Sequence, residues 1–300
     1  MIKERNSIII AGIVLYNPNT QRLKENIEAI MSQVDGIVII DNGSTESSYN
    51  NIIETFDNII CIRNEKNMGI AYALNQICGY AYTHGFDWVL TLDQDSIAKP
   101  GMVDVYRSIA NDKIGILGCW IHDRGYQIDE SWGIEQGTFE TDWVITSAAF
   151  TNVKAWKDCG GFDNGMFIEW VDWDICEAMR KVGYKIMKTY KTKLIHELGH
   201  NTRLVMVRYH VMQVMNHKPI RYYYSVRNRI YMARKYKHIG LWEQLKEIGF
   251  KLYTVERYEK NKLQNFFAII KGTIAGFFQK VEYNNIREEY LKLFVSDKNL

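Results

Sequence analysis

Two aspartates at alternate positions follow a predicted buried strand. Trp88 to Leu92 favour an extended conformation, turn-forming residues bracket the stretch, and Asp93 and Asp95 stand at its end. A carboxylate there costs on the order of several kcal/mol unless it is paired or binds a cation. Alternate residues of an extended chain point the same way, so both carboxylates can converge on one hard cation. An ordinary acidic turn, with Ser96 as a helix cap, is the competing interpretation.

Three predicted strands ahead of these aspartates also end in polar residues. Each is a short apolar run followed by a loop or a helix start, which is typical of a doubly wound α/β sheet. Ligands of such sheets bind outside the carboxyl ends of the strands, so the polar residues are candidates for one site. The strands are 8–15, 36–40 and 59–62, and the residues after them are Tyr16 with Asn17, Asp41, and Asn67 with Gly69. Asn67 and Gly69 also fit an ordinary helix entry.

A second acidic segment follows a glycine-rich turn. Asp172 and Asp174 alternate with Trp170 and Trp173, and Glu169 precedes them. An aromatic wall beside a carboxylate can raise its pKa, which suits a general base. A helix start whose acids interact with the helix dipole explains any one of them equally well. The choice of base among Glu169, Asp172 and Asp174 stays open.

His196 comes shortly after the last predicted strand of this region, 184–187. A single histidine at such a place is most often a satisfied polar residue. Together with an acidic pair elsewhere in the chain, it is also a candidate nitrogen ligand of a metal or a phosphate contact.

The composition indicates a folded globular protein. Of the 300 residues, 47% are hydrophobic and 24% charged, and only three are proline, so no long disordered linker is expected. The five cysteines are widely spread and never form a CxxC pair, so they indicate neither a disulfide framework nor a zinc knuckle and fit a reducing cytoplasm. No apolar run reaches about 18 residues, so no transmembrane helix or signal peptide is predicted.

The charge is unevenly distributed. Residues 1–200 hold 18 Lys and Arg against 27 Asp and Glu, a net charge of −9, whereas residues 201–300 hold 19 against 8, a net charge of +11. The predicted domains are an α/β domain over 1–205 and a basic, aromatic-rich helical extension over 206–300. The extension is expected to contact an anionic partner. Attachment to the inner leaflet of a membrane, and a basic cap that serves solubility or dimerisation, are equally open.

Taken together, these motifs resemble inverting glycosyltransferases of family 2, and among them the bacterial rhamnosyltransferase-like branch. The resemblance covers roughly residues 7–235. Its ordered motifs are VLYNPN, IIDNGS, NMGIAYALN, LDQDS, GGFDNGMFI, VDWDIC and LIHELG. It implies a GT-A fold, in which a Rossmann-like, mostly parallel central sheet is flanked by helices, here followed by the C-terminal helical extension.

The resemblance also implies roles for individual residues in binding a nucleotide-sugar donor. Tyr16 and Asn17 would line the nucleotide pocket, and Asp41 would accept a hydrogen bond from the base. Asn67 and Gly69 would touch the ribose or sugar. Asp93 would contact the donor, and Gln94 belongs to a DQD form that resembles the deoxysugar branch and favours dTDP-rhamnose. UDP-linked galactosyl, glucosyl or N-acetylhexosaminyl donors are the alternative.

The remaining implied roles concern the metal, the base and the acceptor. Asp95 would hold Mg²⁺ or Mn²⁺ on the diphosphate, helped by His196, and Asp172 would be the catalytic base. The acceptor would be a saccharide or a saccharide linked to polyprenyl diphosphate, as in bacterial surface polysaccharide synthesis. The residues assigned to the acceptor side are Trp170, Trp173 and Arg227. Val171 and Ala148 depart from the family pattern, in which Glu and Gly are usual.

Two readings from other classes compete with a sugar transferase. The interleaved arginines and tyrosines of 221–231 suggest a non-catalytic nucleotide- or nucleic-acid-binding module, which would need neither Asp95 nor Asp172. A nucleotidyltransferase would also present acids at strand ends, but it would want a glycine-rich, basic loop where the chain has LYNPNTQ. The prediction is therefore a cytoplasmic enzyme, with attachment to the inner membrane face left open and no nucleic-acid partner.

Overall fold

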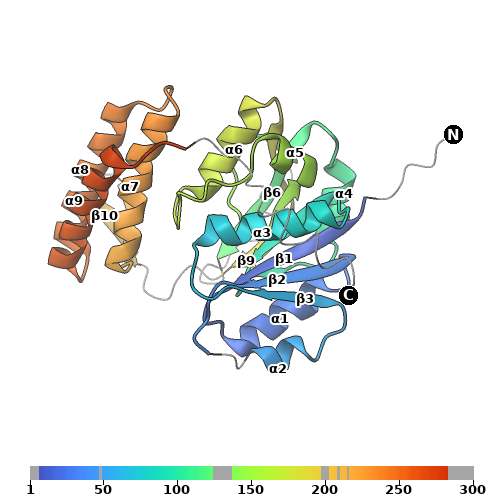
Figure 1. The fold of residues 1–300 in the computed structure, drawn as a ribbon. Coiled ribbons are helices and arrows are strands. Elements are labelled where there is room, and N and C mark those ends of the chain that lie inside the picture. Colours follow the sequence, from blue (N-terminus) through green and yellow to red (C-terminus); the bar gives the residue numbers. More distant parts are fainter. Residues whose placement is uncertain are drawn as a thin grey trace. The chain divides into compact units, whose positions relative to one another are not determined.

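The computed structural model describes residues 7–46, 49–123, 137–196, 203–207, 210–214 and 216–282, which fall into two compact units (Figure 1). The sheet unit comprises the described residues up to Asn164 together with those from Val171 to His196. The helical unit comprises Gly165–Trp170 and the described residues from 203 onward. The predicted domain boundary at residue 205 stays a prediction, and the short segment 165–170 belongs with the C-terminal helices.

The sheet unit alternates strands and helices, as the strand–helix–strand pattern predicts (Figure 1). Its elements are β1 (Ile9–Leu15), α1 (Thr20–Ile30), β2 (Gly36–Asp41), α2 (Asn50–Ile53), β3 (Ile59–Arg63), α3 (Ile70–Thr83), β4 (Trp88–Asp93), β5 (Ile97–Ala98), α4 (Met102–Ile109), β6 (Ile114–Asp123), β7 (Thr138–Glu140), β8 (Ala149–Asn152), α5 (Val153–Asp158), α6 (Val171–Lys181) and β9 (Lys185–His196). The predicted last strand is thus longer than expected, and His196 is its final residue.

The strands form one mixed sheet in the order β3-β2-β1-β4-β8-β6-β9-β5, and β7 pairs with β9. Strands β3, β2, β1 and β4 are parallel, and so is the pair of β6 and β9. Strands β8, β5 and β7 run antiparallel to their neighbours. The predicted α/β class, with a central sheet between helices, is confirmed. The parallel pairing is continuous from β3 to β4 and recurs between β6 and β9.

Buried apolar side chains hold the sheet against its helices. The predicted strand 88–92 is buried throughout, and Trp88 stacks on Phe150 of β8 with ring centroids 4.7 Å apart. The apolar residues at helical spacing along α3 are all buried: Ala71, Leu74, Ile77, Cys78 and Ala81. Strand and helix approach closely at Gly12, where a Cβ atom would lie 2.3 Å from Ile77. Close packing of this kind holds α3 firmly against the sheet.

The helical unit has its own core. Its elements are the antiparallel hairpin β10 (Arg203–Val207) and β11 (His210–Val214), followed by α7 (Pro219–Lys235), α8 (Leu241–Tyr258) and α9 (Lys262–Phe278). Tyr222, Val226, Ile230, Ile248, Val255 and Ile269 form the buried cluster between these helices. Among the described residues, no helix combines the length and the apolar character needed to cross a bilayer.

Candidate functional site

The loops that follow β1, β2 and β4 meet at one edge of the sheet. In the register, Leu15 lies opposite Asp41 on β2, and Val14 lies opposite Asp93 on β4. Strand β1 is the switch point of the sheet, because the next strands along the chain continue on one side of it while β4 lies on the other. Ligands of doubly wound sheets bind outside the strand ends at such a point. The fold therefore brings the predicted donor residues of three loops to one place.

The loop after β1 is tied to both of its neighbours. The backbone N–H of Tyr16 donates to Gln94 Oε1 at 2.9 Å, which joins it to the loop after β4. The Asn17 N–H donates to Ser44 Oγ at 2.8 Å, and Asn17 Oδ1 accepts from the backbone and hydroxyl of Thr45 at 2.9 and 3.0 Å. The Tyr16 ring stays exposed. Asn17 and Gln94 thus hold the loops together, and Tyr16 offers an aromatic surface.

Asp41 is completely buried, and its carboxylate is occupied by other parts of the chain. One oxygen accepts from the Ser44 N–H at 2.9 Å, and the other accepts from the Tyr49 hydroxyl at 2.5 Å and lies 3.1 Å from Arg63 Nε. Burial, followed by the hydrogen bond to Asp41, raises the pKa of Tyr49 well above its ordinary value. Asp41 therefore builds the loop after β2, and its contact with a nucleotide base stays a prediction.

An asparagine network connects the loop after β2 to the start of α3. Asn42 Oδ1 accepts from the Met68 N–H at 3.0 Å and from Asn64 Nδ2 at 3.1 Å. Asn42 Nδ2 donates to Asn67 Oδ1 at 3.1 Å and to the Gly69 carbonyl at 3.2 Å. The predicted pair of Asn67 and Gly69 is thus held by Asn42, which is itself bound by Asn64, and sequence reasoning missed both of these asparagines. Their only signal in the sequence is a cluster of asparagines around two strand ends.

The end of β4 differs from the end of β2, because its carboxylates are half-buried. The backbone carbonyl of Asp93 accepts from Asn26 Nδ2 at 2.6 Å and from the Ser96 N–H at 3.1 Å, which fixes the turn. Asp95 has no hydrogen bond or ion pair with any residue that the structure describes. A half-buried carboxylate without an internal partner is available to a ligand or a cation.

The metal-binding capacity of this edge is limited. No group of three or more His, Cys, Asp or Glu side chains suited to a metal exists among the described residues. Mg²⁺ commonly keeps several waters and binds through one or two carboxylates plus substrate phosphates, so Asp95 fits a cation shared with a diphosphate. His196 ends β9, and its side chain lies outside the part of the chain that the structure describes. Its predicted role as a ligand stays a prediction.

Beneath the end of β4, a buried turn precedes β8. Ser96 Oγ and Ser147 Oγ lie 2.9 Å apart, and Tyr106 donates to the Ala148 carbonyl at 2.7 Å. Ala148 is buried and has a φ of 56°, in the left-handed region that favours glycine. Residues 144–150 form an apolar run that predicts a strand, but only the last two of them belong to one. Strand β8 begins only at Ala149, because the backbone turns at Ala148.

The three candidate bases lie in different environments. Asp172 is half-buried in the first turn of α6, where its Oδ1 accepts from the Trp173 N–H at 3.0 Å. Trp173 stacks on Trp143 with ring centroids 4.9 Å apart. Trp173 belongs to the predicted aromatic wall, whereas Trp143 was not revealed by the sequence. Asp174 is completely buried, and Glu169 forms an ion pair with Arg221 in the helical unit. Asp172 is thus the candidate that combines partial exposure with a place in the sheet unit.

Segment 165–170 is held by α7. Arg227 Nη2 donates to the Gly165 carbonyl at 2.6 Å, and Asn228 Nδ2 donates to the carbonyls of Ile168 and Glu169 at 2.9 and 2.7 Å. Trp170 Nε1 donates to the Ser225 carbonyl at 3.0 Å. Glu169 and Trp170 both have a φ of 68°, which such contacts must stabilise. Trp170 and Arg227 are therefore anchors of this segment, and their acceptor contacts stay predictions.

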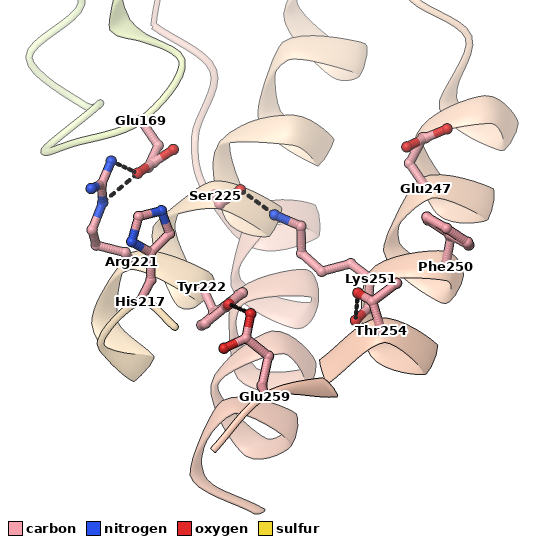
Figure 2. A pocket seen from close by; sticks show the side chains of 10 residues that line it. All are labelled: Glu169, His217, Arg221, Tyr222, Ser225, Glu247, Phe250, Lys251, Thr254 and Glu259. Atoms are coloured by element: carbon pink, nitrogen blue, oxygen red, sulfur yellow. Dashed lines mark hydrogen bonds and ion pairs between the residues drawn. The ribbon is translucent and has the colours of Figure 1, made fainter. Parts of the chain in front are cut away.

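A cavity of about 220 Å³ lies within the helical unit, between α7 and α8 (Figure 2). Lys251 reaches into it and donates to Ser225 Oγ at 3.2 Å, while Tyr222 donates to Glu259 Oε1 at 2.6 Å. Burial lowers the pKa of Lys251, and burial lowers the pKa of His217 to about 4. With cations and carboxylates both lining it, the charge of the cavity selects neither an anionic nor a cationic ligand.

Sequence comparison places relatives along most of the chain. Residues 10–162, more than half of the chain, match the family model described as glycosyl transferase family 2. The chain is 25% identical to dTDP-rhamnosyl transferase RfbF of Shigella flexneri over 289 residues, 90% of this chain and 96% of that protein. It is 20% identical over 235 residues to N-acetylglucosaminyl-diphospho-decaprenol L-rhamnosyltransferase of Mycobacterium tuberculosis, 65% of this chain and 76% of that one.

Solved structures of GT-A proteins share the fold at low sequence identity. GalNAc-T7 with UDP, GalNAc and Mn²⁺ matches with a TM-score of 0.59 and 12% identity over 99% of this chain. The chain spans 57% of the length of that structure. Residues 1–349 of S. aureus TarS match with a TM-score of 0.57 and 11% identity, over 90% of this chain and 80% of that one. TarS bound to UDP-GlcNAc matches with a TM-score of 0.55. These likenesses concern the fold alone.

Proposed function

The chain belongs to glycosyl transferase family 2 and is a glycosyltransferase, and from this premise we propose that it transfers rhamnose from dTDP-rhamnose with inversion. The family and the rhamnosyltransferase-like branch predicted from the motifs are confirmed. The donor, the metal and the acceptor are the parts proposed here. The observation that carries the proposal is the half-buried Asp95, which has no partner among the described residues, at the edge where the strand loops meet.

The donor would lie across the loops of β1, β2 and β4. Tyr16 and Asn17 would line the nucleotide pocket, and Asp93 and Gln94 would face the sugar or ribose. The network around Asn42 keeps the backbone of Asn67 and Gly69 in place beside them. For Asp41 we propose a base contact made through the loop that it holds, because its own oxygens are already occupied.

Asp95 would hold Mg²⁺ or Mn²⁺, because its carboxylate is a hard oxygen ligand that none of the described residues occupies. When bound, the cation neutralises charge on the diphosphate and so makes it a better leaving group. Asp95 would supply one ligand, so the diphosphate itself and water would complete the coordination. His196 stays a proposed second contact.

Asp172 would take the proton of the acceptor hydroxyl. As that oxygen attacks the anomeric carbon, the bond from this carbon to the diphosphate oxygen breaks, and the nucleotide diphosphate leaves with the bonding electrons. The configuration is inverted in this single displacement. No covalent intermediate with the enzyme is needed. The stack of Trp143 and Trp173 adjoins Asp172 along the chain and would line this side of the acceptor site.

For the acceptor we propose a saccharide carried on a polyprenyl diphosphate, in bacterial surface polysaccharide synthesis. The name of the M. tuberculosis relative, which contains a diphospho-decaprenol, supports this choice. Trp173, Trp170 and Arg227 would lie on the acceptor side. A UDP-sugar donor is the second candidate, favoured by the UDP and UDP-GlcNAc complexes of proteins with the same fold.

The hypothesis of a non-catalytic nucleic-acid-binding module loses its main support in the structure. The arginines of 221–231 that suggested it are engaged within the helical unit. Arg221 pairs with Glu169, Arg227 binds the Gly165 carbonyl and lies over Tyr224, and Arg229 donates to Gln244 and lies over Trp170.

The test is release of nucleotide diphosphate from a panel of dTDP- and UDP-sugars, with Mn²⁺ and with a chelator in its place. We expect turnover of dTDP-rhamnose that requires the metal. Asp172→Asn should lower kcat by about 10²- to 10⁴-fold, the range for loss of a general base. Asp104→Asn, an exposed acid on α4, is the matched control. An unchanged kcat in Asp172→Asn would contradict the proposed role of Asp172 as the base. Turnover of UDP-sugars alone would contradict dTDP-rhamnose as the donor.

A further inference from the structure

Helix α9 places its apolar side chains toward solvent. The residues that it buries are Asn265, Ile269, Gly272 and Gly276, which recur at helical spacing along one face. The opposite face carries large hydrophobic side chains, several of them more than half exposed: Leu263 (74%), Phe266 (41%), Phe267 (57%), Ile274 (54%) and Phe278 (84%). A surface helix of a globular protein normally shows the reverse arrangement, with its apolar stripe facing the core.

The packing of α9 on α7 explains this inversion. A Cβ atom at Gly272 would lie 2.3 Å from the Tyr223 carbonyl oxygen, and one at Gly276 would lie 2.6 Å from that of Arg227. The two glycines therefore let the helix backbones approach closely, as small residues four apart do between helices in lipid. Packing through small residues leaves the phenylalanines and isoleucines of α9 on the outside. In water alone, such a surface is a liability.

The charged side chains on α9 and within two residues of its ends are all basic. Across residues 260–281 the charged side chains are Lys260, Lys262, Lys271 and Lys280, with no aspartate or glutamate among them. All four lysines are exposed. Basic residues around an apolar face complement anionic lipid headgroups. Two copies of the chain pairing through this face would bring lysines against lysines, so the charge pattern disfavours a symmetric dimer.

We propose that α9 lies in the plane of an anionic membrane surface, with its apolar face among the acyl chains and its lysines at the headgroups. Its 17 residues span about 26 Å, shorter than the roughly 30 Å apolar thickness of a bilayer, and Lys271 stands near its middle. The helix is therefore suited to lie on the membrane and not to cross it. The attachment is independent of the proposed donor, and it would place the enzyme where lipid-linked saccharides are presented.

The test is flotation of the full chain with vesicles, without donor or acceptor. One set of vesicles is phosphatidylcholine alone, and the other is an equal mixture of phosphatidylcholine and phosphatidylglycerol. The chain should float with the mixed vesicles, and added salt should weaken the binding. Combining Leu263→Gln, Phe267→Gln and Phe278→Gln should lower the vesicle affinity on the order of 100-fold. These side chains are the most exposed of α9, so the fold and thermal stability should be retained.

Two further variants sharpen the test. Ile60→Gln with Val182→Gln replaces exposed apolar residues of the sheet unit, 42% and 48% exposed, and should leave vesicle binding unchanged. Lys262→Gln, Lys271→Gln and Lys280→Gln together should lower the affinity for mixed vesicles at least about tenfold and remove their advantage over phosphatidylcholine.

Failure of the intact chain to float with mixed vesicles, or equal flotation of the α9 triple variant, would overturn the proposal. Light scattering provides a second way to overturn it. If the intact chain were a dimer that does not float, and the α9 triple variant were a monomer, a second copy of the chain would cover the face. Neither flotation nor light scattering involves sugar transfer, so both tests remain valid even if the proposed donor or acceptor is wrong.

Discussion

The ends of β2 and β4 lie on either side of β1, and each carries an aspartate, yet the two carboxylates have opposite surroundings. Asp41 is completely buried, accepts hydrogen bonds from Ser44 and Tyr49, and forms an ion pair with Arg63. Asp95 is half-buried and has no hydrogen bond or ion pair among the described residues. One carboxylate builds its loop and the other is left for a ligand. The same residue type at equivalent strand ends thus serves stability in one loop and, as we propose, chemistry in the other.

Replacing Asp95 should have the largest effect. We expect Asp95→Asn to lower kcat by about 10³-fold, because a metal held on the leaving diphosphate supplies several kcal/mol of charge stabilisation. The unfolding midpoint in urea should not change, since no described residue depends on this carboxylate. Turnover and urea unfolding measured on the same preparation check both parts. A variant with a lower urea midpoint but a normal kcat would mean that Asp95 serves stability and not catalysis.

Gly43 tests the loop that Asp41 holds. Its φ is 81°, and a Cβ atom there would lie 2.4 Å from the carbonyl carbon of Lys66. Gly43→Ala should therefore destabilise the protein by about 3 kcal/mol, through backbone strain and overlap. Urea unfolding measures the loss. Gly101→Ala is the matched control, because its φ is 76° but nothing lies within 4 Å of the added Cβ. Equal losses of stability in both variants would mean that the backbone strain alone destabilises Gly43→Ala and that the overlap with Lys66 does not contribute.

Replacing Asp41 should also destabilise the protein, but less than replacing Gly43. Asp41→Asn keeps the size of the side chain and removes the charge that faces Arg63, whose side chain is 48% exposed and can turn to solvent. We expect a loss of about 2 kcal/mol in the free energy of unfolding. Donor affinity should fall only as far as the loop loosens. A large loss of donor binding with unchanged stability would instead favour the direct base contact predicted from the motif.

The smallest effect should have the opposite sign. Beneath β4, the left-handed conformation belongs to Ala148, whereas after β2 it belongs to Gly43. Ala148→Gly removes the strain of a Cβ at a φ of 56°, and this should stabilise the protein by about 0.5–1 kcal/mol, less the entropy lost by glycine. Thermal unfolding measures it. A lower melting temperature would show that the methyl group packs in the buried turn and contributes more than the strain costs.

Much of the fold and part of the site could be predicted from local patterns. The buried run Trp88–Leu92, the inner face of α3 and the helical character of the C-terminal region all follow from hydrophobic periodicity, which is a property of neighbouring residues. The polar residues at strand ends could be placed at one edge because parallel strands share their direction. The family followed from the order of the motifs.

The sequence alone determined which side chains could do chemistry, whereas the tertiary structure decided which of them are already used. Asn42 reaches Gly69, and Glu169 pairs with Arg221, 52 positions away, so no local pattern could reveal that these groups are occupied. The outward face of α9 was equally hidden, since its apolar residues and glycines are compatible with either orientation until the close contact with α7 selects one. Burial and hydrogen-bond saturation depend on residues distant in the chain, and these decided the difference between Asp41 and Asp95.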